Sequence, residues 1–478
     1  MQPHSPPTTP PIPSARFHVA FRCAKRCTQQ AKEGEICWPL SQVNTRCPLC
    51  GGLLDVVHDL AALSTLSGAA WRSLYEDRKR SFFWPNPSGV WCLREWVNPD
   101  LTDEDIVSLG EGNTPLVPVP LLGQALGVRD LWIKVCGSNP TGSFKDLGMT
   151  GLVSQVHRLR RLGFPIPAVA CASTGDTSAA LAAFCARAQL PAIVFLPVGK
   201  LSHEQLVQPL CNGAITVALE ADFDRLMELV AEFCERTGVY LANSQNPLRI
   251  EGQKTLSVEV AHQLGWESPD WIVIPGGNLG NTTAIMRGFG MARTLGVLER
   301  EPRPLIAQAE QASPLVESFR DGWKPKKTVA GITQATAIAI GNPVNAEKAI
   351  AELVRTRGVV EAATEEEITA AWLLSDRHGM QTDPQTGVAL AAVAKQVRIG
   401  NILPHQRVVV VSTAHGLKFG RLKQAFHLNE PTSPKSTPES DPLRNAPLRL
   451  PAHLPTLENE ILRRIERLSH RWDTEAKE

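Results

Sequence analysis

The chain has 478 residues, of which 49 are basic and 48 acidic, so its formal net charge at pH 7 is +1. Such a balance provides no overall field that would draw the protein to nucleic acid or to a membrane surface. No apolar run approaches the roughly 20 residues that a membrane-spanning helix needs. We therefore expect neither nucleic acid nor a membrane as a partner, and the length predicts two or three domains.

The start of the chain differs in composition from the rest. Residues 1–15 are rich in Pro, Thr and Ser, which predicts a disordered arm. Eleven cysteines in so long a chain do not resemble a disulfide scaffold, so we expect a reducing compartment, the cytoplasm. The alternative is an organelle, because residues 1–32 contain several Arg, Lys, Ser and Thr and no acidic residue, as transit peptides do.

Residues 16–58 form a cysteine-rich segment in which Cys23 and Cys27 precede Cys47 and Cys50. The second pair, in the sequence CPLCG, is typical of a zinc knuckle, because two thiolates on a tight turn can bind one metal ion. The first pair is spaced one residue wider than the usual C-x-x-C. A structural zinc ion and a ribbon without metal are therefore equal alternatives. We expect the later cysteines to be small buried hydrophobes, namely Cys92, Cys136, Cys171, Cys185, Cys211 and Cys234.

Between residues 131 and 420, short β-branched runs alternate with amphipathic stretches. This pattern predicts a parallel sheet that is buried on both faces, and ligands bind to such sheets at the loops that follow the strands. The expected strands are 131–135, 168–172, 192–196, 214–219, 239–242, 271–274, 305–309 and 407–412. The expected helices include 148–162, 177–188, 223–236 and 365–377.

The loop after the first of these strands, 137–146, has the sequence GSNPTGSFKD and places Lys145 at the start of a helix. A loop lysine is ordinarily a solvated surface charge. Here the partial positive charge of the helix N-terminus disfavours the ammonium form, and a lysine that is partly neutral can form an imine with an aldehyde. Such a lysine is what a pyridoxal-phosphate enzyme requires.

Three further loops offer groups that bind anions. Segment 173–178 has hydroxyls at a helix N-terminus, which suits a carboxylate but also an ordinary helix cap. Segment 243–254 contains Arg249, which is suited to phosphate unless a local acid pairs with it. Segment 275–282 is rich in glycine, so its backbone N–H groups can surround a phosphate.

The last loop, 411–416, follows a strongly apolar strand. A hydroxyl at this position can bond a neutral pyridine nitrogen, whereas an acidic residue would protonate that nitrogen. His415 has two interpretations, a general acid or base and a structural histidine in a tight turn, and we favour the second.

With these loops in this order, the sequence resembles threonine synthase, a member of the fold-type II pyridoxal-phosphate enzymes, over roughly residues 53–419. The motifs that carry the resemblance are NPTGSFKD at 139–146, ASTGDTSAA at 172–180, EGQKT at 251–255 and STAHGLKF at 412–419. The stretches GGLLDVVHD at 51–59 and DLGMT at 146–150 are most similar to the plant-type enzymes, and EGNTPL at 111–116 is similar to the general opening motif of the family.

The resemblance implies an α/β fold like that of the tryptophan synthase β chain, with two open twisted parallel-sheet domains, the cofactor between them and a small N-terminal ribbon. The large domain would comprise 59–137 and 251–426, and the small domain 138–250 would carry the cofactor lysine. A linker is expected at 427–456, followed at 457–478 by an amphipathic helix that docks on the protein's own body or on a second subunit. The family also suggests a homodimer.

The resemblance further implies the reaction of O-phospho-L-homoserine with water to give L-threonine and phosphate. Lys145 would carry pyridoxal phosphate and act as the base, and Thr413 would face the ring nitrogen. Asp176 would lie near the phenolic oxygen of the cofactor, where many relatives have Asn. The cofactor phosphate would be held by Gly277, Asn278, Leu279, Gly280 and Asn281. The substrate carboxylate would be bound by Ser173 and Thr174, and the leaving phosphate by Asn243, Ser244 and Arg249.

Other members of the fold group are alternatives. An enzyme similar to cysteate synthase, which joins phosphoserine and sulfite, would need the same cofactor loops. A serine or threonine dehydratase has no leaving phosphate, so the loop of Arg249 argues against it. A non-catalytic paralogue is expected to lose its reactive lysine, and Lys145 is present. Because residues 16–58 differ from the plant-type enzymes, no S-adenosylmethionine effector is predicted.

Overall fold

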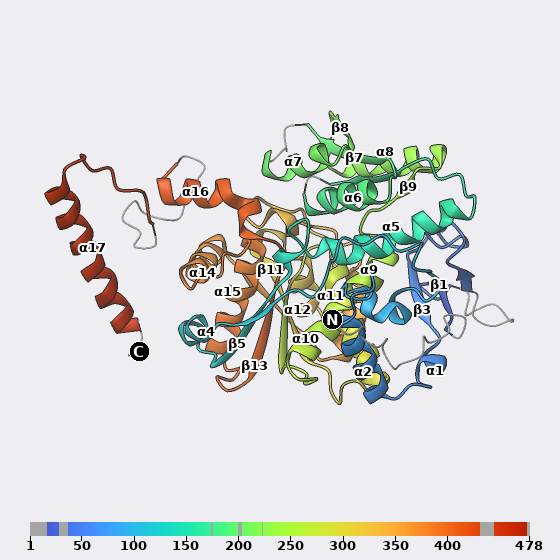
Figure 1. The fold of residues 1–478 in the computed structure, drawn as a ribbon, viewed down its shortest axis with the longest axis horizontal. Helices are drawn as coiled ribbons and strands as arrows, with labels where there is room; N and C mark the ends of the chain where they lie inside the picture. Colours follow the sequence, from blue (N-terminus) through green and yellow to red (C-terminus); the bar gives the residue numbers. More distant parts are fainter. Residues whose placement is uncertain are drawn as a thin grey trace, which may run out of the picture.

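The computed structural model of the protein describes residues 17–27, 37–173, 175–198, 203–221, 223–430 and 444–475. The predicted arm 1–15 and the middle of the predicted linker lie outside the described residues. Three sheets organise the molecule, a small antiparallel ribbon and two larger sheets built mainly of parallel strands (Figure 1).

The N-terminal ribbon is a three-stranded antiparallel sheet in the order β2-β1-β3. Its strands are β1 (Val19–Cys23), β2 (Cys37–Pro39) and β3 (Leu54–His58). One face of β1 is apolar and packs into a hydrophobic cluster with the small domain, because Val19 and Phe21 share that cluster with Leu152 and Val156 of helix α5 (Lys145–Arg161). The ribbon is therefore fixed to the helix that begins at Lys145.

The large sheet has six strands in the order β12-β11-β10-β13-β5-β4. All neighbours are parallel except β4, which pairs antiparallel with β5 at one edge. The sequence pattern did not indicate β4 or β12. The bounds are β4 (Leu116–Pro118), β5 (Asp130–Val135), β10 (Trp271–Pro275), β11 (Arg303–Ala309), β12 (Val359–Ala363) and β13 (Arg407–Ser412).

The small sheet is fully parallel, in the order β8-β7-β6-β9. Its strands are β6 (Val169–Ala172), β7 (Ala192–Pro197), β8 (Ile215–Leu219) and β9 (Tyr240–Leu241). The central strands β6 and β7 are buried along their whole length, as expected. The expectation of burial on both faces is wrong for β8, where Ile215 is 56% exposed, because β8 lies at the edge of the sheet.

Helices cover the large sheet and the small sheet. Those before residue 200 are α1 (Leu60–Leu63), α2 (Gly68–Lys79), α3 (Arg94–Val97), α4 (Pro120–Leu126), α5 and α6 (Asp176–Arg187). The next are α7 (His203–Cys211), α8 (Phe223–Thr237), α9 (Leu248–Gln253), α10 (Leu256–Gln263), α11 (Gly280–Thr294) and α12 (Pro314–Arg320). The last are α13 (Ala346–Arg355), α14 (Glu365–Arg377), α15 (Pro384–Arg398), α16 (Gly420–Leu428) and α17 (Leu454–Glu475). The helices around the small sheet, such as α6, α7 and α8, lie at the top of Figure 1.

The described residues also contain five short 3-10 helices. They are η2 (Trp91–Leu93), η3 (Cys136–Ser138), η4 (Glu310–Ala312), η5 (Thr336–Ile338) and η6 (Gly416–Phe419). The elements η3, η5 and η6 follow or face the ends of strands in the large sheet, so they bring their residues to the side where the ligand loops gather.

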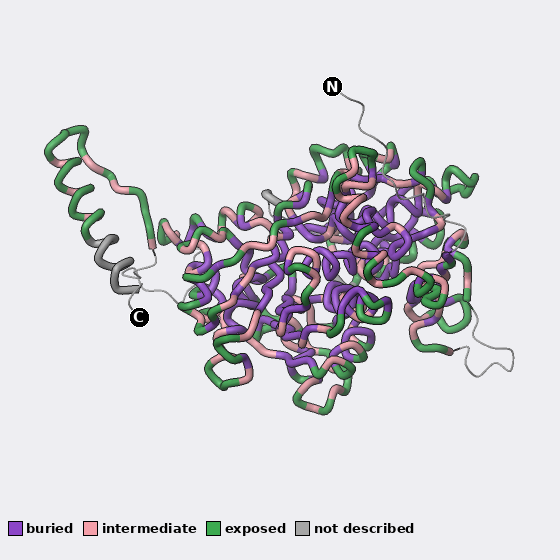
Figure 2. The backbone as a smooth tube through the Cα atoms, turned by 60° about the horizontal axis from the view of Figure 1, so that its bottom comes forward, coloured by how far each residue is buried: buried purple, intermediate pink, exposed green. Residues whose placement is uncertain are grey.

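The C-terminal helix α17 stands apart from the rest of the protein in both views (Figures 1 and 2). Over residues 454–466, where burial is described, its leucines and isoleucines are exposed, with Leu457 at 45% and Ile465 at 52%, so the structure does not dock this part of the helix on its own body. Docking on a second subunit stays a prediction. No helix within the described part of the chain is long and apolar enough to cross a membrane.

The cysteines expected in the core are buried, with one exception. Cys92, Cys136, Cys171, Cys185 and Cys234 are buried, whereas Cys211 is exposed. The prediction for Cys211 is wrong because this residue ends α7 and is followed by the exposed residues Asn212 and Gly213 on the surface of the small domain.

Candidate active site

A single cavity collects most of the residues that the loops were expected to provide. It contains about 690 Å³ of space between protein atoms, its open part included. The predicted residues that line it are Lys145, Asp176, Ser244, Arg249, Gly277, Asn278, Leu279, Gly280, Asn281 and Thr413. Loops from the small and the large sheet therefore meet in one place.

Lys145 is the first residue of α5, and it lines the cavity beside the ring of Phe144, whose centroid lies 4.1 Å from Nζ. Burial lowers the pKa of the amine to about 7, and the positive charge of Arg249 contributes, while the negative charge of Asp176 opposes the shift. About half of the amine is neutral at a pH equal to this value. The neutral amine can attack an aldehyde, so the site makes a covalent cofactor link chemically accessible.

The loop before Lys145 is held in shape by Asp146. Its buried carboxylate accepts hydrogen bonds from the backbone N–H of Thr141, at 2.8 Å, and from the hydroxyl of the same residue. The N–H of Phe144 donates to the carbonyl of Thr413 at 3.0 Å. These bonds join the lysine loop to the loop after β13, so the two sides of the cavity have a fixed spacing.

Arg249, on α9, is a buried cation whose side chain lines the cavity. Its guanidinium has hydrogen-bond donors that are weakly bonded or without a partner among the described residues. Arg249 is 3% exposed, and burial lowers its pKa to about 10. Its Nη1 and Nη2 donate weakly to the carbonyl of Ala242 and the hydroxyl of Thr177, at 3.3 and 3.4 Å, and its Nε has no partner. Among the described residues no carboxylate forms an ion pair with it, which argues against the alternative of a loop arginine paired with a local acid.

A buried guanidinium without a counterion costs free energy unless an anion reaches it. Arg249 lines the same cavity as Lys145 and lowers the pKa of that lysine. The arrangement therefore suits an anionic group of a substrate bound beside the lysine, and a phosphate matches the planar fork of donors best.

The glycine-rich loop ends in helix α11, which starts at Gly280. Leu279, the residue before the helix, has a left-handed φ of 62° and provides no side-chain cap. The amide of Asn281 is buried, and neither its oxygen nor its nitrogen has a protein partner. Unpaired N–H groups at the positive end of a helix and an unpaired buried amide fit a phosphate.

Two glycines of this loop leave little room for a side chain. A Cβ atom on Gly277 would lie 3.1 Å from the Cα of Ile338, and one on Gly280 would lie 3.2 Å from Nδ2 of Asn345. The backbone of these two glycines is therefore packed closely against η5 and the start of α13. Because they carry no side chains, the backbone itself faces the cavity. The residues present fit the phosphate of pyridoxal phosphate.

Thr413, after β13, presents its hydroxyl to the cavity, with Asp383 behind it. Thr413 Oγ1 lies 3.4 Å from both carboxylate oxygens of Asp383, and this carboxylate also accepts from the N–H of Ala414 at 2.8 Å. Asp383 is fully buried, caps α15 and does not line the cavity; burial raises its pKa. The wall therefore offers a hydroxyl, which is the group suited to a neutral pyridine nitrogen.

Asp176, the first residue of α6, forms an ion pair with Lys418 of η6, with Oδ1 and Nζ 2.8 Å apart. The same ammonium donates to the carbonyl of Thr141 at 2.9 Å and to Gln208 at 3.0 Å. Lys418 thus connects the small domain, the lysine loop and the loop after β13. The sequence did not indicate this pair, because the two residues are 242 positions apart (418 − 176).

The remaining substrate residues are placed unevenly. Ser244 lines the cavity, but Ser173 and Asn243 do not, and Thr174 lies outside the described residues. The amide of Asn243 forms two hydrogen bonds with the backbone of Ala172, at 3.0 and 2.9 Å. In this structure Asn243 joins its loop to β6, and its contact with a substrate stays a prediction.

His415 follows the cavity residue Thr413 by two positions but is not part of the cavity wall. Its Nδ1 accepts a hydrogen bond from the N–H of Leu417 at 3.1 Å, and its own N–H donates to the carbonyl of Gly142 at 2.9 Å. These contacts agree with a structural histidine in a tight turn.

Several cavity residues were not found from the sequence: Phe144, Ile250, Gln253, Pro275, Ala337, Ile338 and Gln385. Most are neighbours of predicted residues. Ala337 and Ile338 belong to η5, and Gln385 to the first turn of α15. These segments carry no motif of their own, so no local signal could have identified them. The four predicted metal ligands, Cys23, Cys27, Cys47 and Cys50, lie together in the ribbon, outside the cavity wall.

Comparisons with known proteins agree with this geometry. The family described as "Pyridoxal-phosphate dependent enzyme" matches residues 107–414. "Threonine synthase 2, chloroplastic" of Arabidopsis thaliana is 50% identical over 382 residues, which cover 79% of this chain and 74% of the plant protein. "Threonine synthase" of Methanocaldococcus jannaschii is 39% identical over 373 residues, which cover 77% of this chain and 87% of the archaeal one.

Solved structures extend the likeness to the fold. The crystal structure of threonine synthase from Escherichia coli matches with a TM-score of 0.60 at 22% identity, over 89% of this chain and 96% of that one. A threonine deaminase from Solanum lycopersicum matches with a TM-score of 0.56 at 19% identity, over 68% of this chain and 89% of that one. The expected fold-type II architecture is confirmed. The chain belongs to the pyridoxal-phosphate dependent enzymes and, within them, to the threonine synthase family.

Proposed function

We propose that this protein converts O-phospho-L-homoserine and water into L-threonine and phosphate, with pyridoxal phosphate carried by Lys145. The observation that supports this proposal best is the position of Arg249. A buried cation that pairs with no carboxylate among the described residues lines the same cavity as a lysine whose pKa is lowered to about 7. A substrate that reacts at the lysine and loses a phosphate needs both groups.

The residues that would hold the cofactor come from both domains. Gly277, Asn278, Leu279, Gly280 and Asn281 would surround its phosphate, and the hydroxyl of Thr413 would bond the ring nitrogen. Asp176 would face the phenolic oxygen while Lys418 balances its charge at 2.8 Å. When bound, pyridoxal phosphate supplies an electron sink that stabilises negative charge at Cα of the substrate.

The chain's own groups would then bind the substrate and move protons. Ser244 and Arg249 would bind the phosphate at Cγ and favour its departure, because charge develops on it as the C–O bond breaks. Ser173 and Thr174 would bind the carboxylate. The amine of Lys145, neutral above a pH of about 7, would take the proton from Cα and move protons between Cα and Cβ. A proton is lost from Cβ as phosphate leaves Cγ, and a proton added at Cγ forms the methyl group. Water then adds its hydroxyl at Cβ and a proton returns to Cα, which completes L-threonine.

The test supplies purified protein and pyridoxal phosphate with O-phospho-L-homoserine and follows phosphate and threonine together, with Lys145→Ala as control. Equal amounts of both products, lost in the variant, are expected. Phosphate without threonine would contradict the proposal and indicate an elimination. No turnover with a visibly bound cofactor would favour the cysteate synthase-like alternative, for which phosphoserine and sulfite are tested next. Failure to bind the cofactor visibly would favour the non-catalytic paralogue.

We also propose that the protein is a homodimer. The exposed apolar residues of α17, such as Leu454 at 65% and Leu462 at 58%, support the proposal, because such a helix is stabilised by covering its apolar side. Sedimentation velocity of the full chain is expected to show a dimer, and removal of residues 454–478 to weaken it.

For the compartment we propose the cytoplasm, with an organelle as the alternative. None of the eleven cysteines forms a disulfide in this structure, and this is compatible with both compartments. A fusion of residues 1–32 to a fluorescent protein separates them, since import into an organelle would contradict the cytoplasmic proposal. The Arabidopsis relative is named chloroplastic, which makes a plastid the first organelle to examine.

A further inference from the structure

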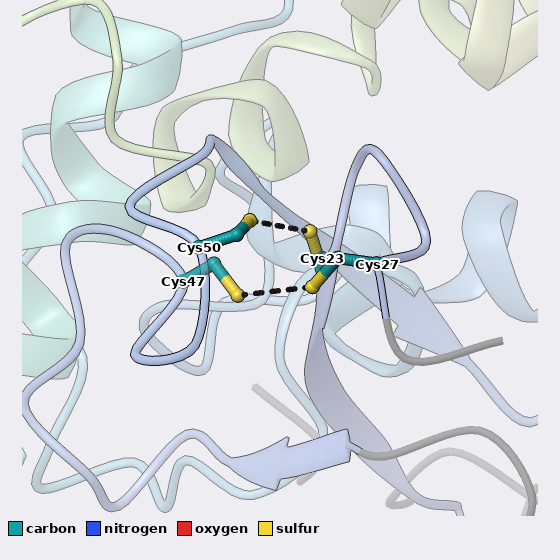
Figure 3. A group of neighbouring side chains, drawn as sticks. All are labelled: Cys23, Cys27, Cys47 and Cys50. Atoms are coloured by element: carbon teal, nitrogen blue, oxygen red, sulfur yellow. Dashed lines mark hydrogen bonds between the residues drawn. The ribbon is translucent and has the colours of Figure 1, made fainter. Parts of the chain in front are cut away.

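Four cysteine side chains converge in the ribbon, away from the cavity (Figure 3). Cys23 ends β1 and Cys27 follows in the next turn, while Cys47 and Cys50 come from the turn before β3. All four Sγ atoms lie within 4.8 Å of one another. In Figure 3 the two pairs face each other across a small gap, and the closest contacts link Cys23 with Cys50 and Cys27 with Cys47.

The distances between these sulfur atoms are those of a metal site. They are 3.6 Å for Cys23 and Cys50 and 3.7 Å for Cys27 and Cys47. A disulfide needs about 2.05 Å, whereas four sulfurs at about 2.3 Å from a zinc ion, in a tetrahedron, lie about 3.8 Å apart. We propose that Cys23, Cys27, Cys47 and Cys50 bind one structural zinc ion.

The backbone around the cysteines is arranged to hold such an ion. The N–H of Gly51 donates to the carbonyl of Cys47 at 2.9 Å, and the N–H of Cys47 donates to the carbonyl of Gly52 at 2.8 Å. Gly51 adopts a left-handed φ of 66°, which closes the turn. Opposite, the N–H of Arg26 donates to the carbonyl of Cys23 at 3.0 Å. Both turns thus point their thiols toward one another.

The ligand set decides the type of metal and its role. Four thiolates are soft ligands that select zinc over magnesium or calcium. They also leave no open coordination position, so the ion is structural and takes no part in the reaction. Each thiol loses its proton to solvent as its Zn–S bond forms. This assignment selects one of the two alternatives that the wide spacing of Cys23 and Cys27 left open.

The zinc knuckle is connected directly to the substrate loop of the cavity. Arg46, the residue before Cys47, donates from Nη2 to Oε1 of Gln245 at 2.8 Å and from Nη1 to the carbonyl of Gly51 at 3.0 Å. Gln245 is buried and follows Ser244, which lines the cavity. One arginine therefore spans from the metal-binding turn to the loop that leads to Arg249.

A second connection runs from β3 to α9. Nε2 of His58, the last residue of β3, lies 2.6 Å from Oε2 of Glu251, and Nζ of Lys254 lies 2.9 Å from the same imidazole nitrogen. Glu251 follows Arg249 by two residues on α9. The ribbon thus supports the phosphate-binding segment at two points, and the zinc ion acts as a distant positioning element for Ser244 and Arg249. This second part rests on the proposed function.

The first experiment measures metal in the full chain, purified with reduced thiols from cells grown with zinc. About one zinc per chain is expected by elemental mass spectrometry, and replacement with cobalt is expected to give the visible spectrum of a tetrahedral thiolate site. Cys47→Ser and Cys50→Ser should lose the metal, and Cys37→Ser, an exposed ribbon cysteine outside the cluster, should keep it. Wild-type protein without zinc and without the cobalt spectrum would overturn the assignment, even if the serine variants fail to fold.

The second experiment tests the connection with Arg46→Ala, using Lys25→Ala, an exposed ribbon residue, as the matched control. Both variants should keep one zinc. Arg46→Ala should raise KM for O-phospho-L-homoserine about tenfold, with a smaller change in kcat, and weaken inhibition by inorganic phosphate by a similar factor. Unchanged KM and unchanged phosphate inhibition in zinc-loaded Arg46→Ala would overturn the positioning role. If the substrate is not turned over, binding of inorganic phosphate to the holoenzyme still tests this role, and the zinc content does not depend on the substrate.

Discussion

The two walls of the cavity bind charge by different means. On the large-domain side, the segment 277–281 offers backbone N–H groups at the start of α11 and no charged side chain. On the small-domain side, Lys145, Asp176 and Arg249 place three ionisable groups around the same space. A backbone site is insensitive to pH and suits an anion that stays bound. Lys145 and Arg249, whose pKa values are lowered by burial, suit protons and anions that change during turnover.

The largest effect is expected when the small-domain side of the cavity, the charged wall, loses the amine of Lys145. Lys145→Ala removes both the covalent link to the cofactor and the base, so kcat/KM should fall by at least about 10³-fold. The backbone wall is intact in this variant, and pyridoxal phosphate should still bind noncovalently. Borohydride treatment followed by mass spectrometry should label Lys145 in the wild type only. A label on another lysine would contradict the assignment.

The next effect distinguishes the binding of the substrate phosphate from the binding of the cofactor phosphate. Arg249→Gln should lower kcat/KM for O-phospho-L-homoserine by about 10²–10³-fold, because the leaving phosphate loses its buried cation. Cofactor affinity should change little, because we propose that segment 277–281 of the other wall holds the cofactor phosphate. Steady-state kinetics and a cofactor titration measure the two quantities separately. Equal losses in both would show that Arg249 binds the cofactor phosphate, which would contradict the assignment of the two phosphates to separate walls.

The charged wall should also make cofactor attachment depend on pH. Since the pKa of Lys145 is lowered to about 7, the cofactor-free protein has a mostly protonated amine below that pH and a mostly neutral one above it. The rate of covalent attachment should therefore rise about tenfold between pH 6 and pH 8 and then level off. Arg249→Gln should move the midpoint upward, because a positive charge is removed. Stopped-flow absorbance measures this rate, and a rise confined to pH above 9 would contradict the expectation.

A smaller effect is expected on the backbone wall. Gly277→Ala places a Cβ 3.1 Å from Ile338, and mild overpacking of this kind costs about 1 kcal/mol, so cofactor affinity should weaken about fivefold. The matched control is Gly420→Ala, since nothing lies within 4 Å of its added Cβ and its φ is −56°. Fluorescence titration with pyridoxal phosphate compares the two. Equal affinity in both variants would argue against close backbone packing at the cofactor phosphate.

The smallest effect is expected for a substitution of His415, which lies next to the cavity but not in its wall. His415→Asn keeps a side-chain acceptor near the N–H of Leu417, so its activity should stay within about twofold of wild type across the pH range. The pH profile of kcat/KM measures this. Loss of one limb of that profile would make His415 a proton-transfer residue, and the boundary of the active site would have to be redrawn.

The elements with strong local patterns were predicted well. The strand 407–412 and the helix 365–377 have the bounds expected from the sequence, because a fully apolar run and a capping box with Thr364 mark them. Strand β12 was missed because its sequence, VVEAA, has only two β-branched residues. The exposed face of β8 was also missed, since the order of strands, and not their composition, places it at an edge.

The sequence by itself determined which loops form the cavity and the parallel-sheet architecture, and it predicts Lys145 as the cofactor lysine, because each depends on residues that are neighbours along the chain. The tertiary structure decided which of these residues face one cavity. It paired Asp176 with Lys418, placed Asp383 behind Thr413 and left Nε of Arg249 without a partner among the described residues. It also brought four thiols to the spacing of a zinc site. These facts depend on distances between segments far apart in the chain, which chain folding alone sets.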